Sequence, residues 1–215
     1  MWFDLHVHTK WSKDSLNEPE KLLKRAKKVG LDGFAVTDHN EIEGAIFTYK
    51  EAKRYDLKVI IGEEVMTDRG EVIALNITEL IPPYRPVDET IDVIKEQGGL
   101  VLAPHPFDTR RKGLGPYLLE VADRVDLIEV INGRSFHFDN EKAFEFAEKL
   151  EKPMVGGSDA HTLMELGKVA TLMEGGNLRR PIKIRRKRWP PLILGVAGST
   201  YAKVKKRLVQ GYVLL

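Results

Sequence analysis

The 215-residue chain contains no cysteine. Disulfides and thiolate metal sites are therefore excluded, and any metal ion must be bound by histidine, aspartate or glutamate. Long apolar runs are also missing, since no segment approaches the roughly 20 apolar residues that a membrane-spanning helix needs. The first residues, Met1–His6, include neither a basic region nor an extended apolar stretch. We therefore expect no signal peptide and a cytoplasmic protein.

Glutamine is scarce, with only Gln97 and Gln210, whereas charged residues make up 31% of the chain and hydrophobic residues 42%. This composition is typical of a globular domain and favours a thermophilic source. No acidic residue follows Glu174, and the segment after it carries 11 Lys and Arg residues. The part up to Glu174 has 23 basic and 32 acidic groups, a net charge of −9. An acidic body suits metal binding, and the basic segment suits an anionic partner.

Short apolar runs alternate with helical patterns along most of the chain, which predicts repeated strand–helix units and a parallel sheet. The expected strands are Trp2–Val7, Gly33–Thr37, Lys58–Val65, Val72–Ile77, Leu100–Ala103, Asp126–Ile131, Pro153–Gly157 and Val169–Leu172. The expected helices are one from Pro19 to Gly30 and others at about Ile42–Tyr55, Asp88–Gln97, Tyr117–Ala122, Asn140–Leu150 and Thr200–Val209. A turn at Gly70-Glu71 predicts a hairpin that interrupts the regular alternation.

Five of the six histidines, together with several carboxylates, lie at or just after strand-like runs. The segments are Asp4-Leu5-His6-Val7-His8, Thr37-Asp38-His39-Asn40, Gly62-Glu63-Glu64, Pro104-His105-Pro106 and Gly157-Ser158-Asp159-Ala160-His161. Such strand ends share one face of a parallel β/α fold, and residues i and i+2 of a strand point to the same side. Each segment alone has a plainer explanation as a cap, a turn or a rigid loop. Five together favour a site for two or three divalent ions, namely Mn²⁺, Zn²⁺ or Fe²⁺.

These motifs resemble those of the PHP (polymerase and histidinol phosphatase) family, from about Asp4 to His161. Ser12, Asp14 and the segment Ile128-Glu129-Val130 extend the match. The resemblance implies a distorted seven-stranded β/α (TIM-like) barrel over residues 1–175, with metal ions at the C-terminal ends of its strands. We expect residues 176–215 to form a basic C-terminal segment that completes or flanks this barrel.

The resemblance also implies a ligand set for each ion. It gives His6, His8, Glu64 and Asp159 to a first metal, Glu64 and His105 to a second, and Asp14, His39 and His161 to a third. Asp38 would orient a ligand without touching a metal, and Arg134 would bind a substrate phosphate. Many family members have another histidine where this chain has Glu71, which leaves the second ion's identity open. His137 belongs to no motif.

The implied activity is hydrolysis of a phosphate ester by a metal-activated hydroxide. Nucleotides, nucleoside bisphosphates or short RNA are the expected substrates, because residues 179–188 are rich in Lys and Arg that would bind extra phosphates. A phosphatase of the histidinol-phosphate type and a non-catalytic, metal-stabilised RNA-binding subunit are the alternatives. The basic segment is equally compatible with a solvated surface, or with membrane-surface contact through Trp189 and Leu192–Val196.

Overall fold

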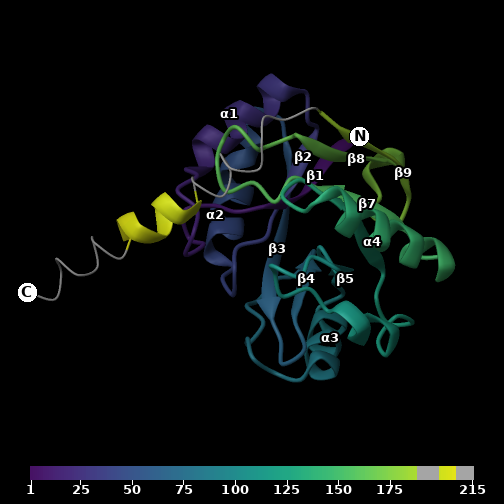
Figure 1. Cartoon of the computed structure of the whole chain (residues 1–215). Coiled ribbons are helices and arrows are strands. Elements are labelled where there is room, and N and C mark those ends of the chain that lie inside the picture. The colour runs from purple at the N-terminus through teal and green to yellow at the C-terminus, as the bar shows by residue number, and fades with distance from the viewer. Residues whose placement is uncertain (188–198, 207–215) are drawn as a thin grey trace, which may run out of the picture.

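The computed structural model describes residues 1–187 and 199–206 of the chain. Its nine-stranded sheet has the order β7-β6-β5-β4-β3-β2-β1-β8-β9. The strands are β1 (Trp2–Val7), β2 (Gly33–Val36), β3 (Lys58–Met66), β4 (Glu71–Leu75), β5 (Leu100–Ala103), β6 (Leu127–Asn132), β7 (Met154–Gly157), β8 (Val169–Met173) and β9 (Pro181–Arg186). Figure 1 shows how this sheet curls around a common centre.

The sheet closes into a barrel through strands β1 to β7. A bridge joins Val7 at the end of β1 to Ala160 after β7, and the His8 N–H donates to the Ala160 oxygen at 3.0 Å. Strands β8 and β9 lie at the seam, with β8 antiparallel to the start of β1 and β9 antiparallel to β8. The expected barrel is confirmed. The sheet adds two strands to the seven of the barrel: β8, which corresponds to the expected strand Val169–Leu172, and β9, which was not expected.

The barrel interior is filled by alternate residues of its strands, because successive side chains of a strand point to opposite faces. The buried interior cluster takes members from β1 through β8. It consists of Phe3, Leu5, Ala35, Ile60, Ile73, Leu75, Leu100, Leu102, Leu127, Val155, Met173 and Leu178. Two further apolar clusters lie between the outer faces of the strands and the helices. The core is therefore layered, with an inner barrel and an outer shell.

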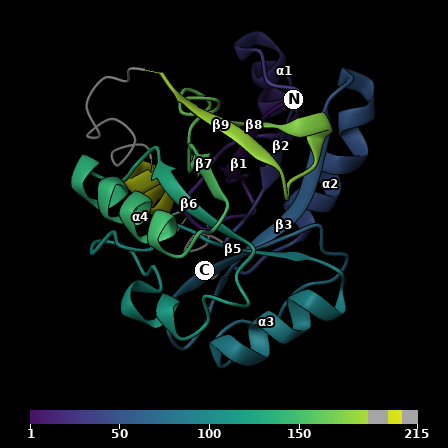
Figure 2. The same ribbon diagram turned by 90° about the vertical axis from the view of Figure 1, so that its right-hand side faces the viewer.

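Helices cover the outside of the barrel (Figure 2). They are α1 (Pro19–Val29), α2 (Glu43–Ala52), α3 (Val87–Glu96) and α4 (His137–Lys149), with short 3-10 turns at Lys53–Tyr55, Gly115–Leu119 and Glu174–Gly176. Helix α1 begins at Pro19 and ends at Gly30, whose φ of 72° suits a glycine after a helix. The expected helices are confirmed within a few residues, except that Tyr117–Ala122 is occupied in part by a 3-10 turn and that the end of the expected helix Thr200–Val209 lies outside the described residues. A further helix, here called the C-terminal helix, spans residues 199–206.

The predicted hairpin at Gly70 is present, and β4 is antiparallel to both of its neighbours. Gly70 has a φ of 141°, and a side chain there would collide with the Lys112 carbonyl at 2.7 Å. Because β4 runs in reverse, its first residue, Glu71, lies at the same end of the barrel as the last residues of the parallel strands. The hairpin thereby adds a carboxylate to the face where the histidines gather.

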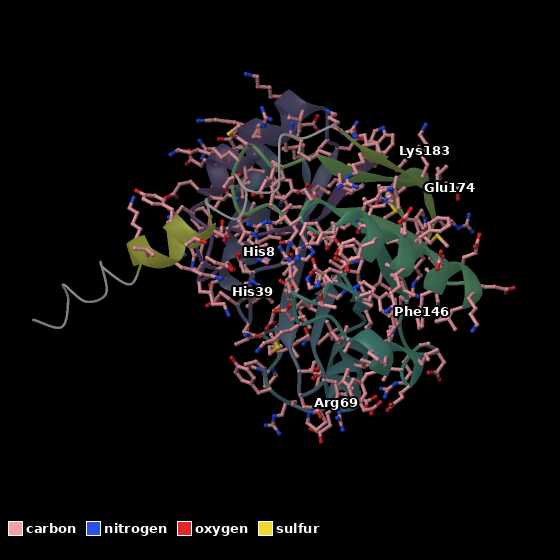
Figure 3. The ribbon with its side chains drawn as sticks, viewed as in Figure 1. His8, His39, Arg69, Phe146, Glu174 and Lys183 are labelled. Atoms are coloured by element: carbon pink, nitrogen blue, oxygen red, sulfur yellow. The ribbon has the colours of Figure 1, made fainter. Side chains whose placement is uncertain are left out.

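Residues 179–187 of the basic segment lie at the other end of the barrel. Arg179 pairs with Asp126 at 2.7 Å, and the Arg185 guanidinium lies over the Trp2 ring. These partners are located where strands begin, and Figure 3 labels Lys183 at the upper right of the molecule, away from His8 near its middle. Residues 179–187 therefore lie away from the metal-binding face, because β9 extends the sheet at its seam. The contact of residues 179–188 with extra substrate phosphates stays a prediction. Arg188, Trp189 and Leu192–Val196 lie outside the described residues.

No helix within the described residues is long and apolar enough to cross a membrane.

Asp4 joins three segments of the barrel wall and gives a test of its closure. Its buried carboxylate accepts the main-chain N–H of Ser158 and of Gly167, each at 2.8 Å. Replacement of Asp4 by alanine leaves buried donors without an acceptor, so we expect the free energy of unfolding to fall by about 3 kcal/mol. Urea denaturation in the presence of a chelator measures this loss. The exposed Glu96→Ala is the control, and equal stability of the two variants would contradict this role for Asp4.

Candidate metal centre

The expected ligands come together at one end of the barrel, at the C-terminal ends of the parallel strands. Figure 3 shows His8 and His39 side by side near the middle of the molecule. Among the described residues, groups of ligand atoms lie within 4.8 Å of one another in four combinations. They are His8–His39–His161, His6–Glu64–His105, His6–His8–Asp159 and His39–Glu64–Glu71.

A bulge in β1 turns its two histidines into the barrel. Phe3 and Leu5 point into the interior, so strict alternation would send His6 outward. The pairing with β2 shifts between Asp4 and Val7, where β1 contains one residue more than its partner. This extra residue reverses the alternation, and His6 and His8 face the centre while Val7 packs outside.

The position of the His6 side chain in the centre also depends on a glycine in β7, Gly157. A Cβ atom on Gly157 would lie 2.4 Å from the Cβ of His6 and 2.7 Å from a carboxylate oxygen of Glu129. Only a residue without a side chain fits there. Further along the same chain segment, Asp159 has a φ of 55°, and on the opposite side of the centre His105 has a φ of 28°. Such positive φ values in residues other than glycine store strain and concentrate at functional sites.

Four buried atoms face one another without forming hydrogen bonds within the described residues: Nε2 of His6, Nε2 of His8, Oε2 of Glu64 and Oδ1 of Asp159. The nitrogens lie 3.4 and 3.5 Å from the Glu64 oxygen, and 3.7 and 3.3 Å from the Asp159 oxygen. Ligands at about 2.1 Å in a tetrahedron are separated by about 3.4 Å. The arrangement therefore fits a single cation held by two imidazoles and two carboxylates.

The far nitrogen of each β1 histidine is held by a polar partner. Nδ1 of His6 donates to Glu129 at 3.1 Å, and Nδ1 of His8 lies 3.3 Å from the Ser12 hydroxyl. A proton on Nδ1 leaves the Nε2 lone pair free for a metal, which is the usual arrangement for a metal-bound histidine. Glu129 also accepts the His105 main-chain N–H at 2.9 Å, so one carboxylate positions two candidate ligands.

Glu64 links this first group to a second. Its Oε1 lies 3.0 Å from Nε2 of His105, while its Oε2 lies 3.0 Å from Nδ1 of His39. Glu71 approaches both imidazoles, at 3.7 Å from His39 and 3.8 Å from His105. The carboxylate of Glu71 thus lies where a second cation between Glu64 and His105 would find a further ligand.

Asp14 lies on the opposite side of His39 from Glu64. Its two oxygens face Nε2 of His161 at 3.2 Å and Nε2 of His39 at 3.6 Å. The side chain of Asp14 is only 7% exposed. The resemblance to the PHP family assigned these same three residues to one ion, and they line the cavity at the rim of the centre.

Buried charge shifts the protonation of the cluster in the absence of metal. Burial by itself would lower the pKa of His6 and of His39, but the neighbouring carboxylates raise the pKa of His6 well above its usual range and that of His39 to about 10. Burial would raise the pKa of Glu64, yet His6 and His39 lower it well below its usual range. Protons on His6 and His39 therefore balance carboxylates that a bound cation would otherwise neutralise.

Asp38 and Arg134 have partners that the sequence did not reveal. Both oxygens of Asp38 accept hydrogen bonds from Thr9, whose backbone follows His8, so Asp38 fixes the turn that carries this histidine. The Arg134 guanidinium is buried and lies 3.2 Å from Glu165.

A cavity of about 400 Å³ opens beside the ligands. Its acidic and imidazole lining consists of Asp14, His39, Glu71 and His161, and its cationic lining of Lys13, Arg110, Arg111, Lys112, Arg134 and Lys203. Sequence reasoning missed most of these cations. Among them, Arg111 pairs directly with Asp159, one of the candidate ligands. The sequence feature that could have indicated Arg111 is the basic run Arg110-Arg111-Lys112, which closely follows His105.

A model of the PHP domain matches residues 4–164 of this chain. The chain belongs to the PHP domain family. An uncharacterised protein of Methanocaldococcus jannaschii, MJ0417, is 35% identical over 98% of this chain and 86% of its own length. Another from the same archaeon, MJ1587, is 43% identical over 63% of this chain and 83% of its own length.

Bacterial replicative polymerases match a shorter stretch. The DNA polymerase III subunit alpha of Buchnera aphidicola is 40% identical over 35% of this chain and 6% of that subunit. Among solved structures, PsfC from Pseudomonas syringae has a TM-score of 0.69 at 20% identity and covers 94% of this chain and 98% of its own. A proposed metal-dependent phosphoesterase from Bifidobacterium adolescentis has a TM-score of 0.63 at 20% identity. This match covers 74% of this chain and 87% of that protein's chain. These structural likenesses show the shared fold.

Glu129 offers a test of how His6 is positioned. Glu129→Gln removes the charge that orients His6 and keeps the size of the side chain. Loss of such an outer partner typically lowers metal affinity about 10- to 100-fold, and we expect a loss in this range. Equilibrium dialysis against Mn²⁺ measures it, with the exposed Glu145→Gln as a control of equal charge change. Unchanged affinity in Glu129→Gln would mean that His6 needs no such support.

Proposed function

We propose that this protein is a metal-dependent phosphoesterase that acts on nucleotides, nucleoside bisphosphates or short RNA. The observation that carries the proposal is the convergence of Nε2 of His6, Nε2 of His8, Oε2 of Glu64 and Oδ1 of Asp159 at 3.3–3.7 Å. A binding module has no need of such a cluster beside an open cavity. Membership of the PHP family and the structural likeness to a proposed phosphoesterase point the same way.

The residues present can hold two or three divalent cations. His6, His8, Glu64 and Asp159 would bind one, Glu64, His105 and Glu71 a second, and Asp14, His39 and His161 a third. Glu71 adds a hard oxygen ligand, which favours Mn²⁺ at the second site. Bound divalent ions would supply an activated water and positive charge for the phosphate oxygens.

The protein's own cations would bind and orient the substrate. Arg111 is directed into the cavity beside Asp159, and Arg110 and Arg134 line the same wall. A planar guanidinium binds two oxygens of one phosphate at once and fixes its orientation. The cationic lining exceeds what a single phosphate on a metal cluster requires. This excess is the reason for preferring substrates with several phosphates.

Removal of metal should abolish turnover and destabilise the protein. Ions that bind only the folded state stabilise it by mass action, about 2.7 kcal/mol at a free concentration 100 times the Kd. We expect protein purified without chelator to contain at least one equivalent of divalent metal, and dialysis against EDTA to lower its melting temperature. Elemental analysis and thermal scans measure both effects. Metal-free protein with an unchanged melting temperature after Mn²⁺ or Zn²⁺ addition would refute the centre.

Substitution of the ligands separates the centre from its surroundings. His6→Ala, Glu64→Ala and Asp159→Ala should each lower kcat at least about 100-fold, since each removes a group that holds charge at the reacting phosphate. His137→Ala is the matched control, because His137 is 79% exposed at the start of α4. Rates on a generic phosphomonoester, a nucleoside bisphosphate and a short RNA identify the preferred substrate. A folded His137→Ala variant as inactive as His6→Ala would overturn the assignment.

A further inference from the structure

The C-terminal helix follows the segment that matches the PHP family, yet it contacts the metal centre. Ser199, Ala202 and Lys203 are spaced as i, i+3 and i+4, so they share one face of the helix. Ser199 and Ala202 are 8% and 1% exposed, and the Ser199 hydroxyl accepts a hydrogen bond from Arg134 at 2.9 Å. Lys205 lies on the other, exposed face. Figure 1 shows this helix, in yellow, on the side of the molecule where Figure 3 places His8.

The far end of the helix is fixed to the loop that carries Asp14. The Lys206 ammonium donates to the main-chain oxygen of Lys10 at 2.6 Å and also to that of Ser12. Two residues beyond Ser12, the loop reaches Asp14. The helix therefore holds its inner face against the rim of the centre at both of its ends.

Lys203, between these two anchors, reaches the rim itself. Its ammonium lies 3.5 Å from Oδ2 of Asp14. The same oxygen faces Nε2 of His39 at 3.6 Å, and the other oxygen faces His161. The ammonium is thus directed at the carboxylate oxygen that a third divalent cation would need.

We propose that Lys203 competes with a divalent cation for the carboxylate of Asp14. The inference rests on the metal centre proposed above. A carboxylate that is only 7% exposed needs a positive partner, and Lys203 supplies one without any metal. A divalent ion at Asp14 would repel the ammonium a few ångströms away, so the two exclude each other. The ions between Glu64 and its neighbours are unaffected, whereas an ion at Asp14 enters only when Lys203 withdraws.

The test is a Mn²⁺ titration by calorimetry, with bound metal counted by elemental analysis after dialysis at fixed free Mn²⁺. Lys203→Met removes the charge and keeps the length of the side chain. In this variant the most weakly bound Mn²⁺ ion should bind about five- to tenfold tighter than in the natural chain. The ammonium no longer pairs with Asp14, and it no longer repels the incoming ion. Lys205→Met removes the same charge from the outer face of the same helix and should change this affinity by less than about twofold. Lys203→Arg should restore the competition.

Equal affinities and stoichiometries in Lys203→Met and Lys205→Met would overturn the proposal while leaving the metal centre intact. Weaker binding in Lys203→Met would also overturn it, by showing that the lysine supports the ion. If the natural chain binds no Mn²⁺, the metal centre itself fails, and the inference fails with it. Melting temperatures of the variants in EDTA show whether each is folded before its titration is interpreted.

Discussion

Concentrated negative charge inside the barrel mouth is the constraint on which the rest of the structure depends. Glu64 and Asp159 are fully buried, and Asp14 and Glu71 are nearly so. Ionised carboxylates are costly to remove from water unless cations or hydrogen-bond donors surround them. The surrounding imidazoles meet part of this requirement when they carry protons. Divalent ions meet it more fully, and the cluster makes physical sense as a binding site for them.

Local irregularities in the barrel strands and loops orient these ligands towards the centre. The bulge in β1 turns His6 and His8 inward, and a second shift in the pairing of β6 with β7 follows Glu129. Left-handed backbone at His105 redirects that side chain after β5 ends. Each departure weakens a strand locally, and the surrounding barrel must supply the stability that holds it.

Much of this arrangement follows from sequence, because polar residues at the ends of apolar runs stand out. The barrel, the hairpin at Gly70 and the residues that gather at one end were all predicted. What could not be predicted is orientation. Nothing in the segment Asp4–His8 reveals that an extra residue breaks the alternation. The segment Ile128-Glu129-Val130 belongs to the family resemblance, but nothing in it reveals that Glu129 positions both His6 and His105. The path of residues 179–187 could not be predicted either, since composition alone does not distinguish a strand at the seam from an arm beside the site.

Family membership is established by the match over residues 4–164. The contacts of Glu129, Arg111 and Lys203 add residues whose positions depend on long-range pairing.

The reversed strand β4 has a consequence for how this centre can vary. Glu71 faces the mouth only because the Thr67–Gly70 turn returns the chain in one particular register. A slip of one residue would move Glu71 to the outer face and bring a neighbouring side chain inward. The length of this turn therefore determines which residue of β4 faces the mouth as a candidate ligand. Insertion or deletion there changes the donor set at a single site, whereas the same change in a parallel strand would disturb the whole wall.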